Sequence, residues 1–129
     1  MRRRGLARLG SRAARASSPG QARARLGFDA ATIVKLGQDQ RAETVLARLM
    51  AEGVSPRFAV RDGRAPTGAS VLVSSHDRNA AIFTFRGANT LIEAADLKDD
   101  AFAVDLVHVA SLSNASADQF QLIIQKAKA

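Results

Sequence analysis

The sequence contains no cysteine, no tryptophan and no tyrosine. Without cysteine the chain has neither a disulfide framework nor a thiolate metal site, and its two histidines alone make no metal centre. No apolar run approaches the roughly 20 residues that a membrane-spanning helix needs, so we expect no membrane contact. The lack of cysteine also fits a reducing cytoplasm, which is the location we predict.

Acidic residues are absent from the first 28 positions, which hold eight arginines. The remaining residues carry 11 basic and 12 acidic side chains, so the formal net charge of +7 comes from this N-terminal segment. Pro19-Gly20 interrupts the segment, and it lacks the apolar centre of a signal peptide. We therefore predict that residues 1–25 are an Arg-rich leader that is disordered or not native. Three interpretations stay open: an organelle transit peptide, a nucleic-acid-binding arm, and a reading frame or start that is not the natural one.

The pattern that begins at Leu26 is that of one α/β domain over residues 26–129. An apolar run over 29–36 predicts a short buried strand. Asp39 is a suitable N-cap for the helix after it, and Gly53 suits its C-terminal end. The apolar residues of that helix recur at the spacing of one helical face: Ala42, Val45, Leu46, Leu49 and Met50.

Two further strands are predicted at Ala69–Ser74 and Ala80–Arg86, joined by a five-residue loop. A two-stranded hairpin with so much apolar area is not stable alone, so we expect it to cover another part of the protein. A shorter strand is predicted before it, at Arg57–Arg61.

The C-terminal third predicts a parallel sheet. Val104–Ala110 is almost continuously apolar, which is typical of a strand buried on both faces. Ser116 and Gln119 have the spacing of a capping box, which predicts a helix from there through Lys128. A crossover helix should lead into another strand, and none follows. We therefore expect an incomplete sheet and a product of low stability that tends to aggregate.

Five blocks of sequence follow one another in this order: LGFDAATIVKLGQD at 26–39, VLARLMAEGV at 45–54, APTGASVLV at 65–73, AIFTFRGAN at 81–89 and DLVHVASL at 105–112. Together they resemble the ribokinase/PfkB family of carbohydrate kinases. They are similar to the family's "VGxD" loop, its following "EGV" helix, its "PTGxS" lid strand, the "RGAN" return strand and a strand of the central sheet. The resemblance covers about residues 26–128 and depends on the order of the blocks, because each block alone is weak.

The resemblance implies an incomplete ribokinase-like parallel-sheet α/β domain with a small β-sheet lid at about residues 57–61 and 67–89. It implies ATP-dependent phosphotransfer to a hydroxyl of a sugar or sugar acid, with ATP and Mg²⁺ as cofactors. The FRGAN block favours such a substrate over a nucleoside. Lid sheets of this family often pair between subunits, so the resemblance also implies a homodimer formed through the lid.

The resemblance assigns six substrate-binding candidates, all on the sugar side of the expected fold: Arg86, Asn89, Gly37, Asp39, Lys35 and Gly68. A guanidinium such as that of Arg86 can hold a sugar hydroxyl or a carboxylate. Each candidate also has a plain structural interpretation: a solvated strand-edge arginine, a turn asparagine, a turn glycine before an N-cap, a solvated lysine and a hinge glycine.

The family's motifs for ATP and magnesium, "GAGD" and "NxxE", have no counterpart in this sequence, and residues 1–25 contain nothing like its opening "GGxxxN" segment. We therefore predict no catalytic residue here. Phosphoryl transfer depends on positioning, on metal-assisted charge neutralisation and on a group that accepts the hydroxyl proton. Without these groups we expect the chain alone to be inactive.

An alternative from another class is a small basic protein that binds RNA or the ribosome through its Arg-rich N-terminal arm, with strongly salt-dependent affinity. The body argues against it, because it has no basic stripe and no tyrosine or tryptophan on which bases can stack. Nucleic acid is therefore not an expected partner.

Overall fold

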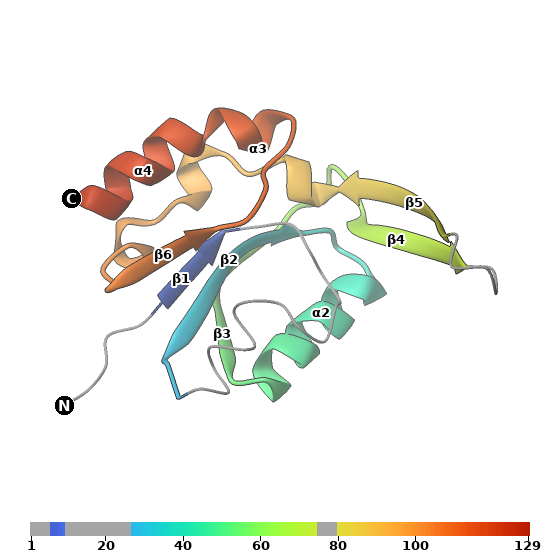
Figure 1. Cartoon of the computed structure of the whole chain (residues 1–129), viewed down its shortest axis with the longest axis horizontal. Helices are drawn as coiled ribbons and strands as arrows, with labels where there is room; N and C mark the ends of the chain where they lie inside the picture. The colour runs from blue at the N-terminus through green and yellow to red at the C-terminus, as the bar shows by residue number, and fades with distance from the viewer. Residues whose placement is uncertain (1–5, 10–26, 75–79) are drawn as a thin grey trace.

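The computed structural model describes residues 6–9, 27–74 and 80–129. Its body is a four-stranded parallel sheet in the order β3-β2-β1-β6, with helices on both faces, and a separate two-stranded sheet of β4 and β5 projects beside it (Figure 1). The strands of the body are β1 (Leu6–Leu9), β2 (Ala30–Leu36), β3 (Val54–Arg61) and β6 (Leu106–Val109). The predicted α/β class with a parallel sheet is confirmed.

Strand β2 and helix α2 (Gln40–Ala51) form as their sequence predicts. Val34 and Leu36 point to one face of the sheet, where they pack with Ala42 of α2. Asp39 is the N-cap of α2 and accepts a hydrogen bond from the Ala42 backbone N–H at 2.9 Å. Gly53 follows the helix with a φ of 72°, the left-handed conformation that glycine adopts without strain.

Strand β3 is longer than predicted and lies in the body. It pairs with β2 in parallel, and its register shifts where Pro56 and Arg57 lie opposite Thr32. Proline cannot donate a ladder hydrogen bond and is tolerated on an edge strand or at such a bulge. Residues 57–61 therefore belong to the main sheet, and the assignment of this stretch to the lid is wrong.

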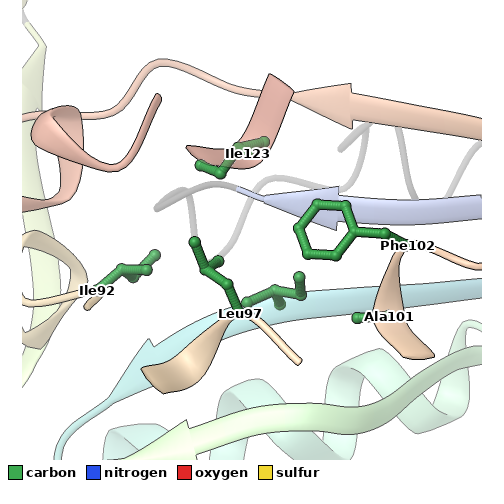
Figure 2. Packing of buried hydrophobic residues seen from close by; sticks show 6 residues of the cluster. Ile92, Leu97, Ala101, Phe102 and Ile123 are labelled. Atoms are coloured by element: carbon green, nitrogen blue, oxygen red, sulfur yellow. The ribbon is translucent and has the colours of Figure 1, made fainter. Parts of the chain in front are cut away.

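The face of the sheet opposite α2 is covered by the chain after the lid. Three short 3₁₀ turns and two helices form this cover: η1 (Ala88–Thr90), η2 (Ala94–Asp96), η3 (Asp99–Ala101), α3 (Ala115–Asp118) and α4 (Phe120–Lys128). Figure 2 shows how Ile92, Leu97, Phe102 and Ile123 meet in the larger hydrophobic cluster, which also includes Ile33 of β2. Each such side chain removed from water contributes about 1.5–3 kcal/mol to the free energy of folding.

Strand β6 is at the edge of the sheet, next to β1 alone. Val107 and Val109 pack against the larger cluster, whereas Leu106 is 52 % exposed. The prediction of a strand over Val104–Ala110 buried on both faces is therefore wrong in length and in burial. An apolar run does not reveal which of its faces the rest of the chain will cover.

The predicted capping box at Ser116 is also wrong, because Ser116 has a tertiary role. It lies inside α3, fully buried, where its hydroxyl donates to the Asn89 carbonyl oxygen and accepts from the Ile92 N–H, both at 2.9 Å. Asn114 precedes α3 instead, with a φ of 54°. A polar group buried this deeply needs partners, and the turns after β5 supply them.

Strand β1 was not predicted. Leu6–Leu9 lies between β2 and β6 and pairs in parallel with both, inside the stretch expected to be a leader. The rest of the predicted leader, up to residue 25, lies outside the described residues, as does the predicted hairpin loop at 75–79.

The lid consists of β4 (Thr67–Ser74) and β5 (Ala80–Gly87), paired in antiparallel. Val71 is directly opposite Phe83, and these side chains are 61 % and 66 % exposed. The hairpin thus projects from the body (Figure 1), and the expectation that its apolar area covers another part of the protein is not met in the described residues. Within the described residues no helix is long and apolar enough to cross a membrane.

Candidate functional site

The candidate site lies where the carboxyl ends of β2 and β3 meet the base of the lid. In open parallel α/β sheets, ligands bind in the crevice outside the carboxyl ends of the strands. β2 ends at Leu36 and continues into Gly37 and Asp39, while β4 starts beside them at Thr67. We call the residues around this junction, 37–39, 66–68 and 86–89, the lid root.

Asp39 joins α2 to the lid root. Its Oδ1 accepts from the Ala42 N–H, and its Oδ2 accepts from the Thr67 N–H at 2.7 Å. The bonds from Thr67 lower the pKa of Asp39 to about 2; burial opposes this shift, and the Ala42 N–H and the nearby Arg41 charge add to it. The fully buried Thr67 hydroxyl in turn accepts from the Gly37 N–H at 2.9 Å.

Two glycines allow the strands of the lid to leave the body side by side. A Cβ on Gly68 would overlap the Arg86 carbonyl oxygen and lie 2.5 Å from Asn89 Nδ2. Gly87 has a φ of 55°, and a Cβ there would overlap the Pro66 carbonyl oxygen. Gly68 is therefore a close-approach position, and the Asn89 side chain beneath it is only 6 % exposed.

Lys35 lies below the lid root and is 3 % exposed. Its Nζ is 2.8 Å from Asp96, 3.2 Å from Asp62 and 3.5 Å from Glu93. Burial lowers the pKa of Lys35, but the contacts with these carboxylates outweigh it and leave the pKa above its ordinary value. The lysine therefore stays charged and draws the turn after the lid towards β2.

Arg64 completes this cluster. It bonds Asp62 through Nε and Nη2 and reaches Glu93 through Nη1 at 2.8 Å. The Arg64 contacts are the main cause of the low pKa values of both carboxyl groups, and Lys35 adds to the shift in each. Lys35, Arg64, Asp62, Glu93 and Asp96 thus form one charge cluster that links three segments of the chain.

Arg86 ends the lid on the face opposite Phe83 and Phe85. Its Nη1 is 3.2 Å from the Ser113 hydroxyl, which belongs to the loop after β6. The guanidinium therefore lies across the carboxyl end of the sheet, between the lid and the body.

The six predicted site residues thus lie near one another, at the lid root or in the charge cluster below it. Gly37, Asp39, Gly68, Arg86 and Asn89 meet at the lid root, and Lys35 lies in the charge cluster two residues before Gly37. Their contact with a substrate stays a prediction.

Sequence reasoning missed the partners that hold these residues. Thr67 carried a signal, because it is the threonine of the block at 65–73, but only its neighbour Gly68 was named as a candidate. Glu93 and Asp96 lie 58 and 61 residues after Lys35 and carry no local signal.

The comparisons with known proteins decide the family. The family model described as "pfkB family carbohydrate kinase" matches residues 21–129, most of the chain. The chain belongs to this family. A curated relative, an uncharacterized sugar kinase from Archaeoglobus fulgidus, is 35% identical over 89 residues, which are 67% of this chain and 35% of the relative.

Solved structures of PfkB-like kinases share the fold. An uncharacterized sugar kinase from Pyrococcus horikoshii superposes with a TM-score of 0.80 at 18% identity, over 95% of this chain and 49% of that one. The same kinase in complex with ATP superposes with a TM-score of 0.79. A putative ribokinase II from E. coli reaches 0.81 at 15% identity, over 97% of this chain and 50% of that one. The ribokinase-like fold is therefore confirmed, and the PfkB chain described here spans about half the length of these structures.

Neither the comparisons nor the described residues support the alternative of an RNA- or ribosome-associated protein. In the described part of the PfkB domain, no group of three or more His, Cys, Asp or Glu side chains is arranged to hold a metal ion. The carboxylates nearest the lid root, Asp62, Glu93 and Asp96, already neutralise Lys35 and Arg64. These residues do not fit ATP-bound Mg²⁺, and the sequence has no GAGD segment to hold phosphate.

Proposed function

We propose that the chain is the sugar-binding part of an ATP-dependent carbohydrate kinase and that the lid root contacts a sugar or sugar acid. The family match, together with relatives described as sugar kinases, supports a carbohydrate substrate. The existence of an ATP complex for one solved relative supports ATP as the phosphoryl donor. In this proposal the groups that hold ATP and Mg²⁺ come from polypeptide other than these 129 residues. We further propose that the protein acts in the cytoplasm, in line with its lack of cysteine.

The charge of Arg86 is the observation that carries this proposal. Five other arginines between residues 27 and 129 have a carboxylate within 4.0 Å: Arg41, Arg48, Arg57, Arg61 and Arg64. Arg86 bonds only a neutral hydroxyl there, that of Ser113. A guanidinium without a carboxylate, placed at the carboxyl end of a parallel sheet, suits an anionic or hydroxyl-rich ligand.

The other predicted contacts would surround such a ligand. Gly37 and Gly68 have no side chain, and other groups of the lid root fill the space beside each, so these glycines shape the wall of such a site. Asn89 lies beneath Gly68 and close to Arg86 in sequence. In our proposal Arg86 and Asn89 contact the sugar directly, the two glycines and Asp39 form its wall, and Lys35 supports that wall.

Binding of a six-carbon sugar acid and of the matching neutral sugar, gluconate and glucose, tests the proposal. We expect saturable gluconate binding to the full chain in ligand-observed NMR, weakened at least about tenfold by Arg86→Gln, because a charge-assisted hydrogen bond contributes about 1.5–3 kcal/mol. Arg57→Gln is the matched control and should leave binding unchanged, because Arg57 lies on β3 and pairs with Asp100. With ATP and Mg²⁺ added, we expect no phosphorylated product.

Three results would contradict this proposal. If neither sugar binds, the lid root is not a carbohydrate site in this chain. If Arg86→Gln and Arg57→Gln bind gluconate equally well, Arg86 is not the group that recognises it. Product formation that survives purification from contaminating kinases would show that the chain carries its own ATP site.

We also propose that two lids pair to form a homodimer. Ala69, Val71, Ala81, Phe83 and Phe85 share one face of the lid, as their cross-strand partners show. Val71, Phe83 and Phe85 are each more than half exposed, and an apolar surface of this kind is typical of an interface. We call this the lid's apolar face.

A further inference from the structure

The two ends of the lid are both anchored to the carboxyl end of β2. We propose that Asp39 and Lys35 are positioning residues that set the orientation of the lid, Asp39 through Thr67 and Lys35 through the 93–96 turn. This role concerns the orientation of the lid itself. Only its effect on a sugar bound beneath the lid rests on the proposed function.

Away from its root, the described part of the lid is largely exposed. Side chains on both of its faces are more than half exposed, as Leu72 and Ile82 are on one face and Val71 and Phe83 are on the other. A hairpin with two free faces takes its direction from the place where it joins the body (Figure 1). The contacts at the lid root therefore decide where Arg86 lies.

The first anchor holds the start of β4. The Thr67 N–H donates to Asp39, the Thr67 hydroxyl accepts from the Gly37 N–H, and Asp39 is itself held by the Ala42 N–H of α2. Each carboxylate oxygen of Asp39 thus accepts a backbone N–H from a different element. A single side chain fixes the start of the lid relative to the helix.

The second anchor holds the chain that leaves β5. The Ala88 N–H donates to the Pro66 carbonyl oxygen, which keeps the two ends of the lid together. A few residues later, Glu93 and Asp96 reach Lys35, and Asp96 also accepts from the Glu93 N–H at 2.8 Å. Lys35 therefore holds this turn against β2.

Both anchors start from one rigid segment. Lys35, Gly37 and Asp39 are spaced by two residues at the end of a strand that is almost entirely buried. Removal of Lys35 would leave three carboxylates facing one another with only Arg64 to neutralise them, so the turn would move away from β2. Removal of the Asp39 carboxylate would leave the buried Thr67 N–H without its acceptor.

The alternative for Lys35 is direct contact with a ligand. Its ammonium group has three donors, its three carboxylate neighbours lie within 3.5 Å, and the side chain is 3 % exposed. An ammonium in this position acts on a ligand through the groups that it holds.

Spin labels measure the orientation of the lid directly, because the chain has no native cysteine. Ser74→Cys places one label on the lid and Gln125→Cys places the other on α4, and both positions are exposed and away from the two anchors. Double electron–electron resonance on the doubly labelled full chain, mixed with excess unlabelled chain and without sugar or ATP, should give one narrow distance distribution within the chain. Asp39→Ala and Lys35→Met should each broaden it or shift its maximum, and Lys35→Arg, which keeps the charge, should restore most of it.

Two control variants separate positioning from loss of stability. Arg48→Met removes an ion pair on α2 that does not touch the lid root, and Ile123→Val reduces the core. Both should leave the distance distribution unchanged, although Ile123→Val lowers the melting temperature. If Lys35→Met does not fold, Asp96→Asn weakens the same anchor from the other side.

The proposal is overturned if Asp39→Ala and the Lys35 or Asp96 variant keep the narrow distribution, or if Ile123→Val broadens it equally. Because the measurement needs no ligand, it stands apart from the gluconate experiment. A chain that binds no sugar but loses its lid orientation in Asp39→Ala would refute only the proposed function.

Discussion

Single residues at the lid root have environments that their local sequence does not reveal. Lys35 was predicted at the end of a strand, with solvation as its plain interpretation, and it is instead buried among Asp62, Glu93 and Asp96. Its strand and its position could be predicted because they depend on neighbouring residues. The carboxylates that hold it could not be, because the fold brings them from distant segments.

Gly87 offers a test of backbone geometry at the residue scale. Gly87→Ala combines a φ of 55° with an overlap between the new Cβ and the Pro66 carbonyl oxygen. We expect a loss of at least ~3 kcal/mol in the free energy of unfolding, measured by urea denaturation. Gly27→Ala is the matched control, since Gly27 has a φ of 83° but nothing within 4 Å of a Cβ, and should cost about 1 kcal/mol. Equal losses in the two variants would mean that the lid strands do not approach each other as described.

At the scale of elements, the sequence predicted best where structure depends on local signals. β2, α2 and the lid strands follow from periodicity, an N-cap and a C-terminal glycine. The segment from β6 to α3 was predicted worst, because Ser116 bonds Asn89 and Ile92 instead of capping a helix. Local capping rules give way where a buried polar group finds a tertiary partner.

The low pKa of Asp39, the N-cap of α2, predicts how the stability of the chain depends on pH. The pKa of Asp39 is about 2 in the folded chain and about 3.9 in an unfolded one, so the folded state favours its charged form. The stability that it contributes is therefore fully present above about pH 4 and is lost as the pH falls from 4 towards 2. We expect the melting temperature of Asp39→Asn to fall less over this range than that of the unsubstituted chain.

Asp29→Asn provides the comparison for this titration. Asp29 is exposed and precedes β2, and no contact in the described residues holds its side chain. Its replacement removes one carboxylate outside the lid root, so the difference in slope between the two variants isolates what the Thr67–Asp39 contact contributes. If Asp39→Asn and the unsubstituted chain lose stability in parallel below pH 4, the Thr67–Asp39 contact does not form in solution.

For the molecule as a whole, the order of the sequence blocks predicted more than any block alone. The two lid blocks, which stand between the blocks of α2 and β6, indicated the family by their order. The position of β1 in the centre of the sheet was missed. The β1 stretch Leu6–Leu9 is too short, and too rich in arginine on both sides, to be distinguished from its surroundings by composition.

The lid's apolar face gives a prediction about assembly. We expect sedimentation to show a concentration-dependent dimer and Phe83→Ser to be monomeric. At dilutions where both chains are monomeric their melting temperatures should agree, because Phe83 is 66 % exposed in the single chain. Met50→Ser, which changes an exposed apolar side chain on α2, should still dimerise. Dimerisation of Phe83→Ser as strong as that of the unsubstituted chain would place the interface elsewhere.

The central place of β1 has a consequence for the order of events during protein synthesis. Leu6 pairs with Leu106, so β1 is synthesised long before the strand that closes its second edge. Contacts between residues so far apart form slowly, because the loop between them must first lose much of its freedom. β2, α2 and β3 are near neighbours in sequence and can assemble early, with the nascent N-terminal strand exposed to chaperones until residue 109 has been translated.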